Sequence, residues 1–542
     1  MFLYTSVLIF LGTVCFGHGQ ESCNCGPDEY PLPKIVKVNQ ETHQFIDEFG
    51  RSSWFHGTNV VTKQFPFHPD LGDPSVCNNT LPSPFCDADM DYLQQLGVNV
   101  VRLGVMWQGA EPTRGIYNCT YFCVIHGIIQ SLAKRNIYTL IDVHQDVLAR
   151  QFCQEGVPDW FVRKDWIANE SLRFPFPQAA PFTTDDNGIP DPWDQCWQIG
   201  ANWFLSYFSV ATSDAFGKFY ANYDGLLDSF ALYWAKIAQE FKNHKSVMGY
   251  NLLNEPWAGD IYENPALLIP GVADDVNLAA VWEQVTTSIR QVDNETIIFF
   301  EGVTWDIVDG HPNVPGGDGS KAALSYHYYA PPQLGLHPAL QNRVKDHERL
   351  KSGGILTEFR MWGGNGDEDV KLIDTRIRDT IDAAEKYLQS WVGWGFHSVV
   401  DRNPLVKKHY ARTYASAVAG KLLSTGFNED TADFYAVWEV DKSVIEPTEV
   451  RLSQETYYAD GYEVRIMPST WASWEEVDEG RMIKIIYKDD VVVDNGNITI
   501  RIFPRDPTLD NNSGFSHFYY GPRSLLSWLT LFCMVWYDVY LG

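Results

Sequence analysis

Short apolar runs alternate with amphipathic stretches through most of this 542-residue chain, from about residue 34 to residue 410. The apolar runs have the length of buried strands, and stretches such as 226–243 and 276–292 carry apolar residues at helical spacing. This alternation is typical of β/α units that build a parallel sheet. The eight candidate strands are 54–61, 98–107, 138–144, 247–254, 297–301, 322–329, 354–359 and 390–396.

Eight such units predict a closed (β/α)8 barrel, the TIM barrel, over residues 34–420. The third strand is followed by a long segment, residues 147–222, which is rich in Pro, Asp and Trp. We expect this insertion to lie over the face where the carboxyl ends of the strands meet, because active sites of this fold lie there.

After about residue 420 the pattern changes to short alternating runs separated by Gly, Pro and Asn, without helices between them. The runs 434–440, 448–452, 462–467, 482–488 and 498–503 predict an antiparallel β-sandwich over residues 421–505. We expect a linker at 506–523 and an apolar tail at 524–542. A chain of this length is too long for a single core, which agrees with two domains.

The composition narrows the class of ligand. The formal net charge of −28 disfavours nucleic acid as a partner, because phosphates require basic patches. The 19 tryptophans and the aromatic share of 14% fit either core packing or stacking on sugar rings. Composition alone gives no indication of oligomeric state.

The N-terminus and the cysteines indicate export. An apolar run at 2–16 and small residues up to Gly19 predict a secretory signal at 1–19. We expect up to four disulfides, with Cys77–Cys86 and Cys119–Cys123 as candidate local pairs, and no zinc site, because paired Cys-x-x-Cys motifs are absent. The eight cysteines concerned are Cys23, Cys25, Cys77, Cys86, Cys119, Cys123, Cys153 and Cys196; Cys533 lies in the tail.

Six sequons agree with the secretory pathway: Asn78, Asn118, Asn169, Asn294, Asn497 and Asn511. The sequence therefore predicts a secreted or extracellular glycoprotein, with a membrane anchor at its C-terminus as one alternative.

Polar and aromatic residues recur where the predicted barrel strands end. Glu255 closes the fourth strand and Glu358 the seventh. Two carboxylates about 5 Å apart are what a retaining glycosidase needs, one as nucleophile and one as general acid/base. Such a pair requires no metal and no cofactor. The other strand-end candidates are Lys63, Arg102, Asp142, His144, Asp146, Asn254, His327, Tyr329 and Trp394.

This set of residues resembles glycoside hydrolase family 5, and within it the endoglycoceramidases. The resemblance covers roughly residues 40–505, with Arg360 as a departure, since many relatives have Gly there. Its motifs are Asn59-Val60-Val61-Thr62-Lys63, Asp142-Val143-His144-Gln145-Asp146, Asn254-Glu255-Pro256-Trp257, Thr357-Glu358-Phe359 and the segment 410–420 ending in Ala417-Val418-Ala419-Gly420.

The resemblance implies hydrolysis of the bond between glycan and ceramide in glycosphingolipids, with Glu358 as nucleophile and Glu255 as acid/base. It implies that Asn254 binds the sugar 2-hydroxyl and that Trp394 forms the floor of the −1 sugar site. Tyr329 and Arg102 would orient Glu358, with His327 in support. Lys63, Asp142, His144 and Asp146 would bind the first sugars.

The substrate implied is a lipid, so we expect a membrane or lipid micelle surface as a partner. Apolar side chains at 174–177, 203–205, Trp257 and 267–269 either supply a surface for ceramide or simply pack the loops. Two alternatives are another β-glycoside as substrate, as in an endo-galactosylceramidase-type enzyme, endoglucanase or mannanase, and a catalytically silent glycan- or lipid-binding barrel.

The tail has the layout of a glycosylphosphatidylinositol signal. Asn512-Ser513-Gly514 are small residues, followed by a spacer at 515–523 and nineteen mostly apolar residues at 524–542. Asp538 interrupts the apolar run and disfavours a spanning helix. A secreted form without an anchor is the other alternative.

Overall fold

The structure is a computed structural model that describes residues 22–69, 85–167, 183–304, 310–330, 335–362, 369–395 and 403–505. The predicted signal (1–19), linker (506–523) and tail (524–542) lie outside the described residues. Among the residues that are described, no helix has both the length and the apolar character needed to cross a membrane.

The predicted barrel is confirmed. Eight parallel strands close in the order β10-β11-β4-β5-β6-β7-β8-β9. All eight predicted strands are present, shorter by a few residues at most ends. Their bounds are β4 (His56–Val60), β5 (Val100–Gly104), β6 (Tyr138–Asp142), β7 (Val247–Asn251), β8 (Ile297–Phe300), β9 (Ala322–Tyr328), β10 (Gly353–Phe359) and β11 (Ser390–Gly393).

Amphipathic helices cover the barrel. Helix α6 illustrates why they form: Leu227, Phe230, Trp234, Ile237 and Phe241 are buried at helical spacing. The helices are α1 (Asp87–Gln95), α2 (Trp107–Ala110), α3 (Cys119–Ala133), α6 (Leu226–Phe241), α7 (Ala279–Arg290), α8 (Leu336–Leu350), α9 (Val370–Lys386) and α11 (Pro404–Tyr410), with α4 (Lys164–Ile167) and α5 (Val210–Tyr220) in the insertion after β6.

The interior of the barrel changes character along its axis. An apolar cluster that includes Phe45, Leu140, Met248 and Phe299 fills the end where the strands begin. Side-chain volume is tightly matched there, since a Cβ added at Gly249 would lie 2.1 Å from the Phe299 ring. Polar side chains gather at the opposite, carboxyl end of the strands, as described below.

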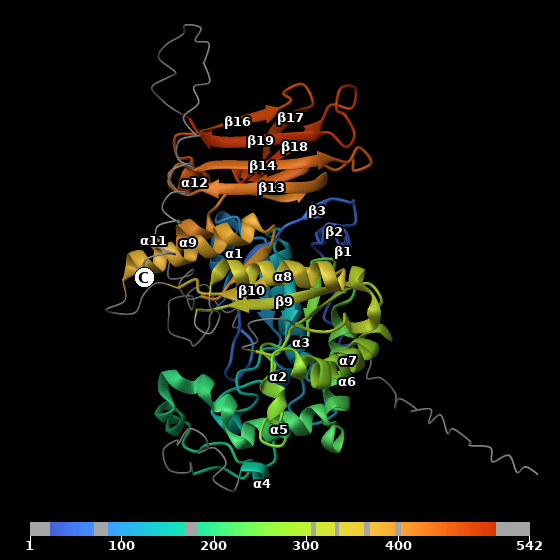
Figure 1. The fold of residues 1–542 in the computed structure, drawn as a ribbon, viewed down its shortest axis with the longest axis vertical. Helices are drawn as coiled ribbons and strands as arrows, with labels where there is room; N and C mark the ends of the chain where they lie inside the picture. The colour runs from blue at the N-terminus through green and yellow to red at the C-terminus, as the bar shows by residue number, and fades with distance from the viewer. Residues whose placement is uncertain are drawn as a thin grey trace, which may run out of the picture.

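Two antiparallel sheets pack face to face at one end of the molecule (Figure 1). The insertion helices α4 and α5 lie at the opposite end of the molecule. A seven-stranded sheet has the order β1-β2-β3-β12-β15-β18-β17, and a four-stranded sheet has the order β13-β14-β19-β16. Their strands are β1 (Ile35–Val38), β2 (Phe45–Asp47), β3 (Ser52–Ser53), β12 (Tyr414–Val418), β13 (Gly420–Asn428), β14 (Asp433–Val440), β15 (Thr448–Arg451), β16 (Tyr462–Met467), β17 (Ala472–Val477), β18 (Met482–Tyr487) and β19 (Asn497–Pro504).

The antiparallel sheets confirm the predicted C-terminal antiparallel β-sandwich, whose five predicted strands are β14, β15, β16, β18 and β19. The sequence pattern did not indicate that residues 35–53, before the barrel, belong to the larger sheet. β3 pairs with β12 through Ser53 opposite Ala417 and Ser52 opposite Val418. The two structural units are therefore interleaved along the chain.

Two disulfides link the N-terminal segment to helix α3 of the barrel. Cys23 bonds to Cys119 and Cys25 to Cys123, so the predicted pair Cys119–Cys123 is wrong. Cys119 and Cys123 lie one turn apart on α3, and both face the segment that precedes the barrel. A third bond joins Cys153 to Cys196 within the insertion. Cys86 is also disulfide-bonded, and its predicted partner, Cys77, lies outside the described residues.

Candidate active site

The structure brings the predicted strand-end residues together at the carboxyl end of the barrel. Glu358 lies on β10, and Glu255 follows β7 with a φ of 42°. The backbone N–H of Glu255 donates to Oε2 of Glu301 at 2.9 Å, which fixes this turn. Carboxylate oxygens of Glu255 and Glu358 and a ring nitrogen of His327 lie within 4.8 Å of one another. This spacing matches the separation of about 5 Å that direct nucleophilic attack requires.

Arg102 organises the base of the site from β5, where its side chain is fully buried. Its Nη1 donates to Oε1 of Glu358 at 2.7 Å. Charged hydrogen bonds of this kind satisfy buried carboxylates and fix their orientation. The remaining acceptors are Asn59 (3.0 Å), Asp142 (2.8 Å), Asn251 (2.9 Å), Asn254 (2.9 Å) and Glu301 (3.2 Å).

Glu358 is held at both oxygens. Arg102 donates to Oε1, and the hydroxyl of Tyr329 donates to Oε2 at 3.1 Å. Burial raises the pKa of Glu358 to about 7, and the positive charges of His327 and Arg102 oppose this rise. A nucleophile in this setting is desolvated yet fixed in orientation, which favours attack on an adjacent carbon.

His327 links the two glutamates. Its Nδ1 lies 2.7 Å from Oε1 of Glu255 and 3.7 Å from Oε2 of Glu358. Burial by itself would lower the pKa of His327, but the negative charges of Glu358, Glu301 and Glu255 raise it to about 9. The imidazole is therefore protonated at neutral pH, and its Nδ1–H donates to Glu255.

A second polar group lies beside the glutamates. The Nδ1–H of His144 donates to Oδ2 of Asp142 at 3.0 Å. The imidazole ring stacks on Trp394, with centroids 5.1 Å apart and an interplanar angle of 13°. Lys63 pairs with Asp146, and its Nζ lies 5.5 Å from the Trp394 ring centroid. Aromatic and hydrogen-bonding groups side by side are suited to a pyranose ring.

The same group resembles a set of metal ligands. His144, Asp146 and Glu155 offer atoms within 4.8 Å of one another. The ammonium of Lys63, however, pairs with Asp146 and lies 2.9 Å from Oε1 of Glu155. A protonated lysine among these carboxylates already supplies the positive charge that an ion would bring.

Two important site residues were not predicted. Glu301 ends the fifth strand and accepts hydrogen bonds from Arg102, Asn251, Ser325 and the backbone of Glu255. Its position at a strand end was the available signal, the same signal that identified Glu255 and Glu358. Glu155 was missed because it lies in the insertion, where periodicity carries no information about partners.

The comparisons with known proteins agree with this geometry. Residues 79–398 match the cellulase model of glycosyl hydrolase family 5, and residues 412–502 match the C-terminal domain model of the same family. The endoglycoceramidase of Cyanea nozakii is 40% identical over 469 residues, which cover 82% of this chain and 90% of the relative. The chain belongs to the endoglycoceramidases of glycosyl hydrolase family 5.

The endoglycoceramidase of Hydra vulgaris is 38% identical, over 87% of this chain and 90% of that relative. Endo-glycoceramidase II from Rhodococcus sp. has a similar fold, with a TM-score of 0.64 and 21% identity over 85% of this chain and 99% of the solved one. As a member of family 5, the chain is a glycoside hydrolase, as the sequence predicted.

Proposed function

We propose that this family 5 chain hydrolyses the bond between the oligosaccharide and the ceramide of glycosphingolipids, with retention of configuration. The observation that most supports this reaction is that Glu255 and Glu358 lie close together. Beside them is a group of aromatic and polar side chains suited to a sugar ring. Relatives that carry the name endoglycoceramidase, at 40% and 38% identity, support the substrate class.

In the first step, a carboxylate oxygen of Glu358 attacks the anomeric carbon. The bond from that carbon to the ceramide oxygen breaks, and Glu255 transfers its proton to this oxygen. Arg102 and Tyr329 hold Glu358 in position, and their hydrogen bonds stabilise its ionised form.

In the second step, Glu255 removes a proton from water, and the water oxygen attacks the anomeric carbon. The bond to Glu358 breaks, which restores the carboxylate. Two inversions at one carbon give net retention. Both proton transfer and covalent catalysis come from carboxylates, so this route uses no cofactor.

Sugar recognition follows from the remaining side chains. Asn254 would bind the 2-hydroxyl, where a hydrogen bond gains strength in the transition state. Trp394 would form the floor of the −1 site. Lys63, Asp142, His144 and Asp146 would bind hydroxyls of the first sugars. The protonated His327 would position Glu255.

The ceramide side requires an apolar surface. A cavity of about 110 Å³ is lined by apolar residues that include Phe208, Leu267 and Val303. Trp257 is only 2% exposed and packs against Tyr207 and Phe208, so it supports this wall from behind. The flanking side chains of Leu268 and Ile269 are 52% and 57% exposed. We infer that they face the lipid, on a membrane or micelle surface.

We also propose that the protein is exported and glycosylated. The disulfides require an oxidising compartment. The sequons Asn118, Asn294 and Asn497 are exposed and accessible to modification. A C-terminal lipid anchor would hold the cleft against a membrane; phosphatidylinositol-specific phospholipase should then release activity from expressing cells, whereas a mature peptide ending at Gly542 would exclude the anchor.

The experiment for the proposed reaction is mass analysis of products from a mixed glycosphingolipid pool. Intact oligosaccharide and free ceramide are expected with the native protein and not with Glu358→Gln. A galactosylceramide-series lipid and carboxymethylcellulose serve as competing substrates. Preferred cleavage of either one, or equal turnover by Glu358→Gln, would contradict the proposal.

A further inference from the structure

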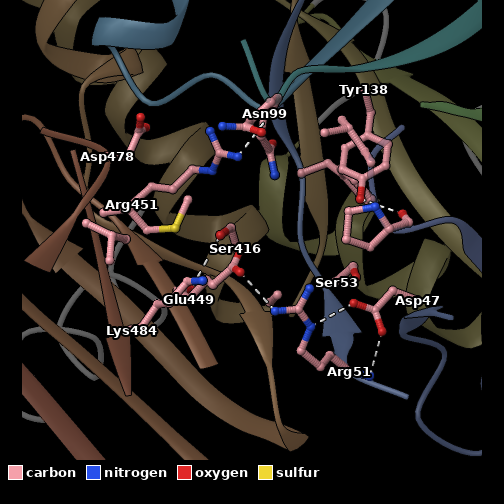
Figure 2. Close-up of a pocket in the computed structure, with 17 residues that line it drawn as sticks. Asp47, Arg51, Ser53, Asn99, Tyr138, Ser416, Glu449, Arg451, Asp478 and Lys484 are labelled. Carbon is pink, nitrogen blue, oxygen red and sulfur yellow. Dashed lines mark hydrogen bonds and ion pairs between the residues drawn. The ribbon is translucent and has the colours of Figure 1, made fainter. Parts of the chain in front are cut away.

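A second cavity lies at the other end of the barrel from Glu255 and Glu358, where the strands begin. Its volume is about 360 Å³, within the range of small-molecule sites. One wall is the face of the seven-stranded sheet that carries Glu449, Arg451 and Lys484 (Figure 2). The opposite wall comes from the starts of β5 and β6, with Asn99 and Tyr138.

The charged face of this sheet is not required by the fold. Val450 and Ile483, which alternate with these residues, are fully buried in the core between the two sheets. The face towards the barrel could likewise be apolar, because it also packs against another layer. It carries ionised groups around an open volume instead.

Pairing within the protein accounts for the acidic groups of the cavity. Arg51 donates to Asp47 at 2.8 Å and to Glu449 at 3.0 Å. Asp478 pairs with Arg481 at 2.8 Å. Each of the three carboxylates in this cavity thus has an arginine bound to it, and Arg51 binds two of them.

Among the described residues, no carboxylate is bound to the other two cations that line the cavity. Arg451 is 7% exposed, and its Nη2 donates to the backbone oxygen of Asn136 at 3.0 Å, while its Nε is buried without a hydrogen-bond partner. Within the part of the chain that the structure describes, the ammonium of Lys484 makes no hydrogen bond and no ion pair, although the residue stands directly opposite Glu449 in the sheet. Figure 2 shows the Arg451 side chain extending from the sheet towards Asn99. The Nε of Arg451 is a buried donor without an acceptor, which is costly, and Lys484 is half-buried, so the cavity is suited to a ligand that supplies acceptors.

We propose that this cavity binds a small organic anion, with its carboxylate or phosphate between Arg451 and Lys484. Arginine suits the flat, two-oxygen edge of such groups, and lysine adds a point charge. The volume admits a body the size of a monosaccharide, and Tyr138 and Met482 supply apolar contact for it. Three carboxylates and three cations line the cavity, so its attraction for an anion comes from the positions of Arg451 and Lys484 and not from an excess of positive charge.

The test is calorimetric titration of the mature, disulfide-bonded protein with three probes of similar size: glucuronate, glucose 6-phosphate and neutral glucose. Inorganic phosphate is a fourth probe, which separates recognition of the anion from recognition of a sugar anion. We expect glucuronate or glucose 6-phosphate to bind, and glucose to bind more weakly than either.

Lys484→Gln should weaken anion binding about tenfold or more, because a hydrogen bond to a charged group is lost. Arg451→Gln should weaken it as well. The matched control is Lys421→Gln, since Lys421 is an exposed lysine on β13 outside the cavity. Arg451 also joins the sheet to the loop before β6, so its variant could unfold. Lys484 makes no such contact, and its variant keeps the test decisive.

Anion binding that Lys484→Gln reduces and Lys421→Gln preserves supports the proposal. No heat with any anion, or equal loss in both variants, overturns it. Equal binding of glucose also overturns it, because recognition would then not depend on the charge. Glycolipid turnover should be unchanged in Lys484→Gln, so this outcome is independent of the proposed reaction.

Discussion

His327 donates a hydrogen bond to Glu255, with 2.7 Å between Nδ1 and Oε1. The protonated imidazole also lies near Glu358, 3.7 Å from Oε2. A single buried cation thus faces both catalytic candidates, and its removal should affect the protonation of the nucleophile.

Replacing His327 with Gln should move the acidic limb of the kcat/KM profile to higher pH. The charge of His327 opposes the rise in the pKa of Glu358, which is about 7 in the native protein. Without that charge the pKa rises further, so Glu358 ionises only at higher pH. A pH series of kcat/KM measures the shift, with Lys421→Gln as the control. An acidic limb that stays in place or moves to lower pH would contradict this role.

Glu255→Ala should lose nearly all turnover of glycolipid yet retain the first step with an activated aryl glycoside. A good leaving group needs no proton, so the glycosyl-enzyme would form and accumulate. Azide should then restore turnover, with a glycosyl azide of retained configuration as product. Glu358→Gln should lose several powers of ten on both substrates. Absence of azide rescue would remove Glu255 from the acid/base role.

Arg102→Met should destabilise the fold by about 3–5 kcal/mol, because it leaves Asp142, Glu301 and Glu358 buried without their cation. Urea unfolding monitored by tryptophan fluorescence measures the change. Arg465→Met, at a position exposed on β16, should stay within about 0.5 kcal/mol. Equal stability of the two variants would show that the network around Arg102 contributes nothing to folding.

We expect Glu429, which lies between the barrel and the sheets, to make a pH-dependent contribution to the free energy of unfolding. Burial by itself would raise its pKa, but hydrogen bonds and charges from His409 and Arg412 lower it to about 2. A carboxylate with a lowered pKa stabilises the fold above about pH 4.5, and this contribution disappears as the pH falls towards 2. Glu429→Gln should therefore cost about 3 kcal/mol at pH 7, from about 1.4 kcal/mol per pKa unit, and progressively less as the pH falls below about 4.5. Urea unfolding from pH 7 to pH 3 checks the trend, and a difference independent of pH would refute it.

A chain that ends at Gly420 should aggregate. β14, with Phe434, Ala436 and Trp438 fully buried, would be lost together with the other strands that cover β12. The exposed apolar face would then associate between molecules. Light scattering of the truncated protein after refolding measures this. Soluble, active protein of this length would show that the sheets are dispensable.

The sequence predicts the barrel well, because each strand is a local apolar run and closure follows from their number. Glu255, Glu358 and Arg102 are predictable for the same reason, since parallel strands all end at one rim. Residues whose partners lie far away in the sequence are harder to predict. Cys119 and Cys123 lie close in sequence, yet each pairs with a segment nearly a hundred residues earlier.

Strand β17 was missed for a different reason. Four of its six residues are exposed, and its sequence, Ala472 to Val477, includes two adjacent glutamates, so it lacks the alternation of a half-buried strand. It forms the edge of the seven-stranded sheet, where charged side chains are favoured. Strand β1, at the opposite edge of this sheet, is only four residues long, too short for periodicity to reveal its partner.

Because β3 pairs with β12, the strands of the nascent chain cannot all pair in the order in which they are synthesised. Ser53 leaves the ribosome 364 residues before Ala417, its partner in the sheet. At about 5–20 residues per second, Ser53 waits roughly 20–70 seconds for that partner. All eight barrel strands, from β4 to β11, emerge within this interval, before β12 does. The barrel can therefore assemble before β3, which pairs locally with β2, gains β12 as its second neighbour.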